Sequence, residues 1–413
     1  MNGTVASDSS VYYQSGYWND LPLVQRYLNR RATGDPAVSW SEHLAGYHGG
    51  AFAKALVLNC GNGWVERGLV QAGLVKEAVG VDYSDDLLRS ARGEADKLGL
   101  PLRYAQLDTN SARWPEDGFD LVINYAAGHH VAYLDRVLRS ITEILPTAGM
   151  LVSWDYVGAH RNQYPAAQWE VAWQLNGSLP DGFRHAEMIY PHLPTMLATD
   201  PTEAIHSELI LPVMRRYFEL EYVRALGGGL AYPVLTFNQR LQERPSDESE
   251  PAVERVLAAD EAYTDGDPMG RTLFAYVIAR PRKGALADSA QLAEWTAEED
   301  ERERRGAENG GRYYPHTLLG SVYDALDRAR REAGLSAEQP SGLGAPPAPE
   351  RAPEPALEWA PEPAPGPPAT GPAALLARLR ASQRLRAIAK GVPGARPAVL
   401  WLRHRRAVRA ARH

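Results

Sequence analysis

Residues 55–63 constrain the fold of this chain more than any other stretch. An apolar run, Ala-Leu-Val-Leu, ends in Asn-Cys-Gly-Asn-Gly, and a helical pattern follows. A second apolar run ends in Asp82, nineteen residues after Gly63. A glycine turn after a strand lets the backbone approach a ligand closely, and an acid ending the next strand can accept hydrogen bonds from ribose hydroxyls. The spacing predicts a parallel sheet that binds a nucleoside-containing cofactor.

Two classes of nucleoside cofactor fit this pattern. A nicotinamide dinucleotide needs a further glycine at position 66, so that the helix N-terminus can reach the pyrophosphate. Glu66 occupies that position, and its carboxylate would repel a pyrophosphate. S-adenosylmethionine carries no phosphate and tolerates this residue. The sequence therefore favours S-adenosylmethionine, with an NAD(P)-dependent oxidoreductase as the alternative.

The order of the later motifs resembles the class I S-adenosylmethionine-dependent methyltransferases. The resemblance covers residues 50–160 well and 161–281 more loosely. Residues 119–124, Phe-Asp-Leu-Val-Ile-Asn, resemble the fourth strand of that family, and residues 145–152, with Gly149 in the turn, resemble its helix-turn into strand five. The resemblance implies an α/β, Rossmann-like, doubly wound sheet of seven strands, the last of them antiparallel.

The same resemblance implies a set of cofactor contacts. Asn59, Gly61 and Gly63 fall on the motif that holds the methionine end, although the family usually has an acid at the first of these positions. Asp82 falls on the ribose-binding acid, and Asp108 on the acid near the adenine amine. The predicted cofactor-binding residues are Asn59, Gly61, Gly63, Asp82, Tyr83, Asp108, Thr109 and Asn124.

Candidate catalytic residues follow strands four and five. Methyl transfer from a sulfonium is a direct displacement, and a hydroxyl acceptor benefits from a general base such as histidine. His129 and His130 lie in the loop after strand four, so either is a candidate base, unless one caps the next helix and shapes the pocket. Asp155 and His160 form a second candidate pair, unless they are structural hydrogen-bonding groups at a strand end.

These residues predict methyl transfer to an oxygen of a small-molecule or glycan-like acceptor. The preference for oxygen rests on the histidines. The glycan suggestion rests on a resemblance of residues 155–158 and 161–164 to bacterial methyltransferases that accompany glycosyltransferases. Asn124 is followed by Tyr-Ala-Ala rather than Pro-Pro and an aromatic residue, which argues against a nucleic-acid amine as acceptor. A non-catalytic protein that binds the same cofactor remains a further alternative.

Composition narrows the expected partners and compartment. Cys60 is the only cysteine, which excludes an internal disulfide, and its place inside the glycine turn predicts a small buried filler. The first residues resemble no secretory signal, and no apolar run reaches the roughly 18 residues that span a bilayer, so we expect a cytoplasmic protein. No metal site is predicted, because the histidines lack a ligand-like spacing with cysteines or carboxylates.

Charge is distributed unevenly along the chain. Residues 373–413 hold eleven Lys and Arg and no acid, so they carry a charge of +11. Since the whole chain carries −7, the first 372 residues carry −18. An acidic body does not suit an enzyme that acts on nucleic acid. Four alternatives stay open for the basic tail. It stays solvated, folds back on the acidic body, binds an acidic partner or contacts an anionic membrane surface.

Composition shifts divide the chain into five segments. Residues 156–217 are rich in aromatic residues and histidines, and we expect them to form a substrate lid beyond the carboxyl ends of the strands. Twelve prolines in residues 340–372 predict an extended linker. The predicted segments are a helical N-terminal cap (1–48), a methyltransferase domain (49–283) with inserts at 156–217 and 238–270, a helical extension (284–333), a Pro/Ala-rich linker (334–372) and a basic tail (373–413).

Periodicity predicts the individual elements. Strands are expected at 55–59, 77–82, 102–106, 119–124, 149–155, 218–226 and 272–280, and core helices at 64–73, 84–98 and 131–145. Ser39 and Glu42 have the spacing of a capping box at the start of a short helix. Residues 286–308 are highly charged and predict an exposed helix.

Overall fold

The computed structural model describes residues 16–185, 188–242, 249–311 and 313. The predicted linker and basic tail, and the predicted disorder of the C-terminal extension, lie outside these residues. Within the described ranges, no helix combines the length and apolar character needed to cross a membrane.

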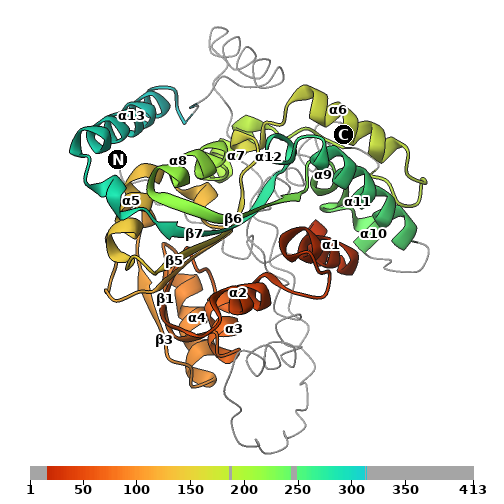
Figure 1. The fold of residues 1–413 in the computed structure, drawn as a ribbon. Coiled ribbons are helices and arrows are strands. Elements are labelled where there is room, and N and C mark those ends of the chain that lie inside the picture. Colours follow the sequence, from red (N-terminus) through yellow and green to blue (C-terminus); the bar gives the residue numbers. More distant parts are fainter. Residues whose placement is uncertain (1–15, 186–187, 243–248, 312, 314–413) are drawn as a thin grey trace, which may run out of the picture.

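A single seven-stranded sheet organises the structure (Figure 1). Its order is β3-β2-β1-β4-β5-β7-β6; the first five strands in that order run parallel, and β7 pairs antiparallel with both β5 and β6. This confirms the predicted doubly wound sheet with a reversed last strand. The strands are β1 (Phe52–Leu58), β2 (Val75–Asp82), β3 (Leu102–Gln106), β4 (Leu121–Tyr125), β5 (Met150–Tyr156), β6 (Phe218–Gly227) and β7 (Phe274–Pro281).

Side chains of the central strands alternate between two hydrophobic cores, as the period of a strand requires. In β1, Ala55 and Val57 belong to one core, and Leu56 and Leu58 to the other. Both faces of the sheet are therefore covered, which explains why the central strands are nearly continuous apolar runs. Helices α5 and α8 supply most of the helical residues of the second core, and α1, α2 and α3 contribute to the first.

Thirteen helices surround the sheet within the described residues. They are α1 (Pro22–Thr33), α2 (Trp40–His48), α3 (Trp64–Gln71), α4 (Asp85–Lys97), α5 (Leu134–Ile144), α6 (Ala166–Gly177), α7 (Leu193–Thr199), α8 (Ile210–Tyr217), α9 (Ala231–Leu235), α10 (Gln239–Gln242), α11 (Glu250–Asp265), α12 (Pro268–Arg271) and α13 (Ser289–Glu308). Helix α5 begins three residues later than expected, because Gly128–His130 form a separate 3-10 turn.

The N-terminal helices pack on the antiparallel side of the sheet. Helix α1 contacts β6 and α11, and α2 begins at the capping box formed by Ser39 and Glu42, as the spacing predicts. Tyr27 of α1 donates a hydrogen bond of 2.8 Å to the fully buried Asp260 of α11. Asp260 also accepts from the backbone N–H groups of Gly228, Leu230 and Ala231, so one carboxylate fixes the turn between β6 and α9.

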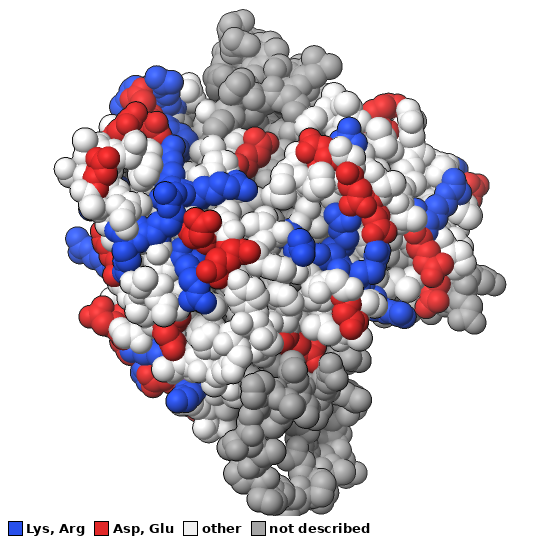
Figure 2. All heavy atoms as spheres, in the orientation of Figure 1, with Lys and Arg blue, Asp and Glu red and all other residues white. Residues whose placement is uncertain are grey.

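The two inserts contact each other at one end of the sheet (Figure 1). Helices α6 and α11 both pack against α9, and the Gln168 side chain donates a hydrogen bond of 2.9 Å to the carbonyl of Gly229. Basic and acidic side chains are interspersed on the visible face (Figure 2), and several form ion pairs between elements, such as Arg30 with Glu261. The inserts therefore form a common wall above the strand ends.

Helix α13 is less exposed than its composition predicts. Leu292 is buried in the second core, and Glu299 is 1% exposed. The Glu299 carboxylate accepts hydrogen bonds from the backbone N–H groups of Asp135 and Arg136, at 2.6 and 3.2 Å. It therefore satisfies N–H groups in the first turn of α5, which have no partner within that helix.

Candidate functional site

The loop after β1 and the end of β2 meet through a hydrogen bond. The backbone N–H of Gly61 donates to Asp82 Oδ2 at 2.8 Å, and the N–H of Ser84 donates to Oδ1 at 2.8 Å. Burial raises the pKa of Asp82, although these backbone donors favour its charged form. A carboxylate has about four acceptor positions, so these bonds leave capacity for a ligand hydroxyl.

Gly63 requires a residue without a side chain. Its φ of +78° is left-handed, and an added Cβ would lie 2.4 Å from the hydroxyl of Tyr104. Gly61 also has positive φ, at +59°. The glycine pair therefore serves the tight turn that brings backbone N–H groups to the end of β2.

Asn59 links three segments at the strand ends. Its amide donates to the carbonyl of Ala127 at 3.2 Å and accepts from the hydroxyl of Thr109 at 2.6 Å. Tyr83 is 64% exposed beside Asp82, where its ring is available to a flat ligand. Asp108 accepts from the backbone N–H of Asn110 at 2.9 Å. The structure thus gathers the predicted cofactor-binding residues at the carboxyl ends of β1, β2 and β3.

A buried network joins β4 to β5. Asp155 Oδ1 lies 2.6 Å from His129 Nδ1, and Oδ2 accepts from the Asn124 amide at 2.8 Å and from the Gly128 N–H at 2.7 Å. Asn124 also donates to the Ser153 hydroxyl. The Asn124 amide, predicted to bind cofactor, is thus committed to holding this loop.

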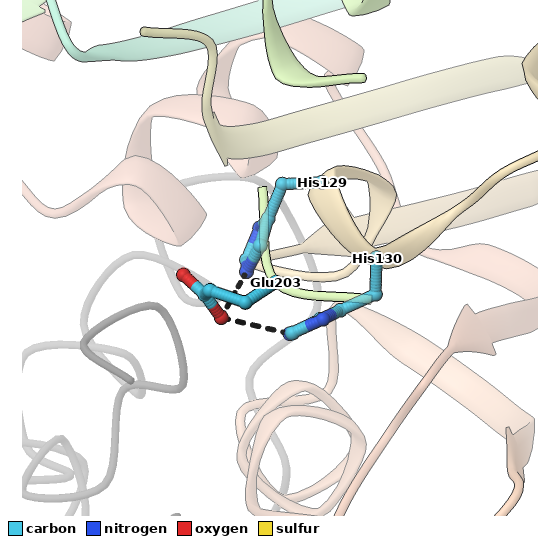
Figure 3. Close-up of side chains that lie close together, drawn as sticks. All are labelled: His129, His130 and Glu203. Atoms are coloured by element: carbon cyan, nitrogen blue, oxygen red, sulfur yellow. Dashed lines mark ion pairs between the residues drawn. The ribbon is translucent and has the colours of Figure 1, made fainter. Parts of the chain in front are cut away.

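Glu203 of the first insert faces both histidines (Figure 3). Its Oε2 lies 3.9 Å from His129 Nε2 and 3.8 Å from His130 Nε2. The His130 Nδ1 lies 3.2 Å from the Thr202 hydroxyl, and the backbone N–H of Ile205 donates to the His129 carbonyl at 3.0 Å. The insert is therefore tied to the turn that carries the histidines.

Burial dominates the electrostatics of this cluster. Burial alone would lower the pKa of His129, but the carboxylates of Asp155, Glu203 and Asp200 together outweigh it and the pKa is raised. Burial and the charge of His129 hold the pKa of His130 well below its ordinary value. Burial raises the pKa of Glu203 to about 7. Sequence reasoning missed Glu203 as a partner of these histidines, because it lies 73 residues beyond His130.

His160 lies in a different cluster from the other predicted catalytic residues. Its Nε2 is 3.3 Å from Glu208, and its ring contacts that of His206. Burial lowers its pKa to about 3. The structure therefore brings His129, His130 and Asp155 together and places His160 beside the 3-10 turn Ser207–Leu209 that precedes α8.

Two further residues of the glycine loop face the interior. Cys60 is buried, and burial raises the pKa of its thiol well above the usual value, in keeping with a filler. Glu66 is fully buried, and its carboxylate would lie 2.8 Å from a Cβ on Gly63, on the side of Tyr104. The Glu66 carboxylate therefore faces the interior of the protein.

A pocket of about 480 Å³, partly open to solvent, lies between the first insert and the segment after β6. Rings dominate its walls, with Tyr164 stacked on Trp169 at 5.9 Å between ring centroids. The lining residues are Tyr164, Trp169, His185, Met188, Ile189, Pro191, Tyr232, Pro233, Thr236 and Phe237. The first insert, expected to form a lid, supplies one wall, and the segment after β6 supplies the other.

Ring contacts connect the pocket to the strand ends. His129 lies 6.3 Å from Tyr156, Tyr156 lies 5.5 Å from Phe274, and Phe274 lies 5.3 Å from Tyr232 of the pocket, measured between ring centroids. The pocket therefore borders the edge of the sheet at which β5 ends and β7 begins.

Comparison with known proteins agrees with this geometry. Residues 56–153 match the model of a protein family described as a methyltransferase domain. The uncharacterized methyltransferase YcgJ of Bacillus subtilis (strain 168) is 27% identical over 105 residues, which are 25% of this chain and 42% of that protein. The match thus spans less than half of the relative.

Some solved structures of low sequence identity match part of this chain. An S-adenosylmethionine-dependent methyltransferase from Mesorhizobium loti is 19% identical, with a TM-score of 0.36, over 58% of this chain and 97% of that one. The cyclopropane synthase MmaA2 from Mycobacterium tuberculosis is 15% identical, with a TM-score of 0.38, over 67% and 100%.

The sheet topology, the glycine loop with Asp82 and the family match define a class I S-adenosylmethionine-dependent methyltransferase domain. Its cofactor is S-adenosylmethionine, and the nicotinamide alternative is set aside. The residues present fit this cofactor: Asp82 would hold the ribose, Tyr83 offers an exposed ring beside it, and the loop of Gly61 and Gly63 would receive the methionine end. The bound cofactor supplies the activated methyl group.

Proposed function

We propose that this domain transfers the methyl group to an oxygen of a small-molecule or glycan-like acceptor that binds in the aromatic pocket. The observation that carries the proposal is the pocket itself, which lies between the first insert and the segment after β6. Mostly apolar walls with a few polar groups are typical of small-ligand sites.

The pocket walls suit a flat or ring-shaped acceptor. Tyr164 and Trp169 are stacked and offer ring faces, while Thr236 and His185 provide polar atoms among them. A sugar ring or a phenolic ring would pack on such faces and direct its hydroxyl groups to the polar atoms.

We favour oxygen as the acceptor atom because a hydroxyl must lose its proton during transfer, and this site holds side chains that can take a proton. The turn after β4 carries His129 and His130, and Asp155 holds the first of these imidazoles in place. Side chains of this kind are suited to hold or accept a proton beside the reaction centre.

Labelled cofactor tests the proposal. The purified protein would be incubated with methyl-deuterated S-adenosylmethionine and panels of phenols, sugars and amines, and products would be read by mass spectrometry and NMR. We expect label on an oxygen, and a higher KM for that acceptor in Trp169→Ala with little change in cofactor affinity. The exposed Trp173→Ala, on the same helix, is the matched control. Label found only on nitrogen or carbon would overturn the oxygen assignment.

A further inference from the structure

We propose that His129, His130 and Glu203 bind a divalent transition-metal ion. One ligand atom from each residue lies within 4.8 Å of the other two, and Glu203 Oε2 lies 3.9 and 3.8 Å from the Nε2 atoms of His129 and His130. In Figure 3 the two rings converge on one oxygen of Glu203. This proposal departs from the sequence-based expectation of no metal site and goes beyond the proposed methyl transfer. An imidazole whose Nε2 binds the ion cannot also accept a proton there, so with the ion bound it is the ion that would lower the pKa of a hydroxyl at its open position.

Both imidazoles are oriented by a hydrogen bond on the opposite nitrogen. His129 Nδ1–H donates to Asp155 at 2.6 Å. The Thr202 hydroxyl donates to Asp200, so it accepts from His130 Nδ1–H at 3.2 Å. Each neutral ring therefore presents the lone pair of Nε2, and a carboxylate behind a histidine is the usual support of a metal-binding imidazole.

The ligand atoms that face one another lack other hydrogen-bond partners. His129 is fully buried and Glu203 is 1% exposed, yet neither His129 Nε2 nor Glu203 Oε2 has a partner within hydrogen-bond distance. Buried polar atoms without a partner are costly and rare in native proteins. A bound ion would satisfy both of them at once.

The spacing and charge of the cluster suit a divalent ion. The separations of 3.8 and 3.9 Å from Oε2 to the imidazoles exceed by about 0.5 Å those around a tetrahedral zinc ion. A small inward movement of Glu203 would close this gap. The carboxylates of Asp155, Asp200 and Glu203 all face the two imidazoles, at 2.6, 3.9 and 3.8 Å, so a cation at this place would be surrounded by acidic side chains.

The donor set favours zinc and similar ions over magnesium or calcium. Two imidazole nitrogens and one carboxylate suit zinc, cobalt, manganese or iron, whereas magnesium and calcium prefer oxygen ligands. Three protein ligands leave at least one position open. The ion would connect the turn after β4 to the first insert. It would lie next to His129, from which ring contacts through Tyr156 and Phe274 lead to Tyr232 of the pocket.

Cobalt and zinc provide the test. Chelator-treated full-length protein would be titrated with Co²⁺, read by visible absorption, and with Zn²⁺, read by calorimetry. We expect saturable one-to-one binding, and an absorption spectrum typical of Co²⁺ with a low coordination number. We expect the affinity of Glu203→Gln to be at least tenfold weaker. Glu208→Gln, five residues further along and paired with His160, is the matched control and is expected to bind like wild type.

His130→Gln covers the case in which Glu203→Gln fails to fold, because His130 is the most exposed of the three ligands. The proposal is overturned if wild type shows no saturable binding, if both ligand variants bind as wild type does, or if Glu208→Gln loses as much affinity as Glu203→Gln. Magnesium binding with equal affinity would overturn the assignment to a transition metal.

Discussion

The carboxylate of Asp155 accepts a hydrogen bond from Nδ1 of His129 at 2.6 Å, and both side chains are fully buried. The bond joins the end of β5 to the turn after β4, at the edge where the cofactor domain meets the first insert. It fixes the tautomer of the imidazole, because an ionised carboxylate can only accept.

Asp155→Asn should therefore destabilise the protein by about 2–3 kcal/mol, because an amide cannot accept from His129, Gly128 and Asn124 at once. Urea unfolding measures the change. Ser153→Ala, which removes only the hydroxyl that accepts from Asn124, is expected to cost about 1 kcal/mol. Equal losses in the two variants would contradict a central role for the carboxylate.

Asp82→Asn should weaken S-adenosylmethionine binding by about 10- to 100-fold, because the carboxylate would accept charge-assisted hydrogen bonds from the ribose hydroxyls and an amide would not. The fold should survive, because the amide oxygen can still accept from the Gly61 N–H. Calorimetry with S-adenosylhomocysteine gives the affinity. Asp86→Asn, exposed on α4 and paired with Arg89, is expected to leave it unchanged; a similar loss there would point to a general charge effect.

Glu66→Gln should make the stability less dependent on pH. Burial raises the pKa of Glu66 from 4.5 to about 7, so the folded state holds a proton that the unfolded state loses between these values. Wild type is thus expected to lose stability as pH rises from about 4.5 to 7. The variant should match wild type near pH 4 and exceed it at pH 8, as followed by chemical unfolding.

Glu94→Gln is the control of opposite sign. The hydrogen bond from Lys97 lowers the pKa of Glu94, so its carboxylate favours the folded state above the ordinary pKa. That variant should be slightly less stable than wild type at pH 8, since the pair is exposed. A Glu66→Gln protein that is also less stable at pH 8 would mean that the buried group is held as an ion.

Asp260→Asn should cost about 3 kcal/mol of unfolding free energy, because four donors converge on this buried carboxylate. Tyr27→Phe removes only one of these hydrogen bonds and is expected to cost about 1 kcal/mol. The adjacent Glu261→Gln disturbs only ion pairs of a partly exposed carboxylate with Arg30 and Arg31 and should be near neutral. Denaturant midpoints compare the three.

The sheet could be predicted because each central strand is an apolar run that ends in a turn or polar residue. Residues 55–59 and 77–82 were expected as strands, and the structure has Phe52–Leu58 and Val75–Asp82. Their outer residues were missed because Lys54 and Lys76 interrupt the apolar pattern. Asp82 and the glycine pair were found because their contacts are local to two adjacent strand ends.

The cluster around His129 could be predicted only in part. His129 and Asp155 were singled out, but as members of different pairs, because sequence spacing carries no information on contacts between β4 and β5. Glu203 comes from an insert without clear periodicity, and only the fold of that insert brings it to the histidines. The burial of Glu299 escaped notice for a similar reason, since it lies among many exposed charges.

The bond from Glu299 to the start of α5 bears on how the gene should be trimmed for expression. The segment that matches known methyltransferases ends at residue 153, and the last strand ends at Pro281. A protein cut after that strand would keep every strand of the sheet but leave the N–H groups of Asp135 and Arg136 without their acceptor. Shortened versions should therefore extend through residue 308 to give good soluble yield.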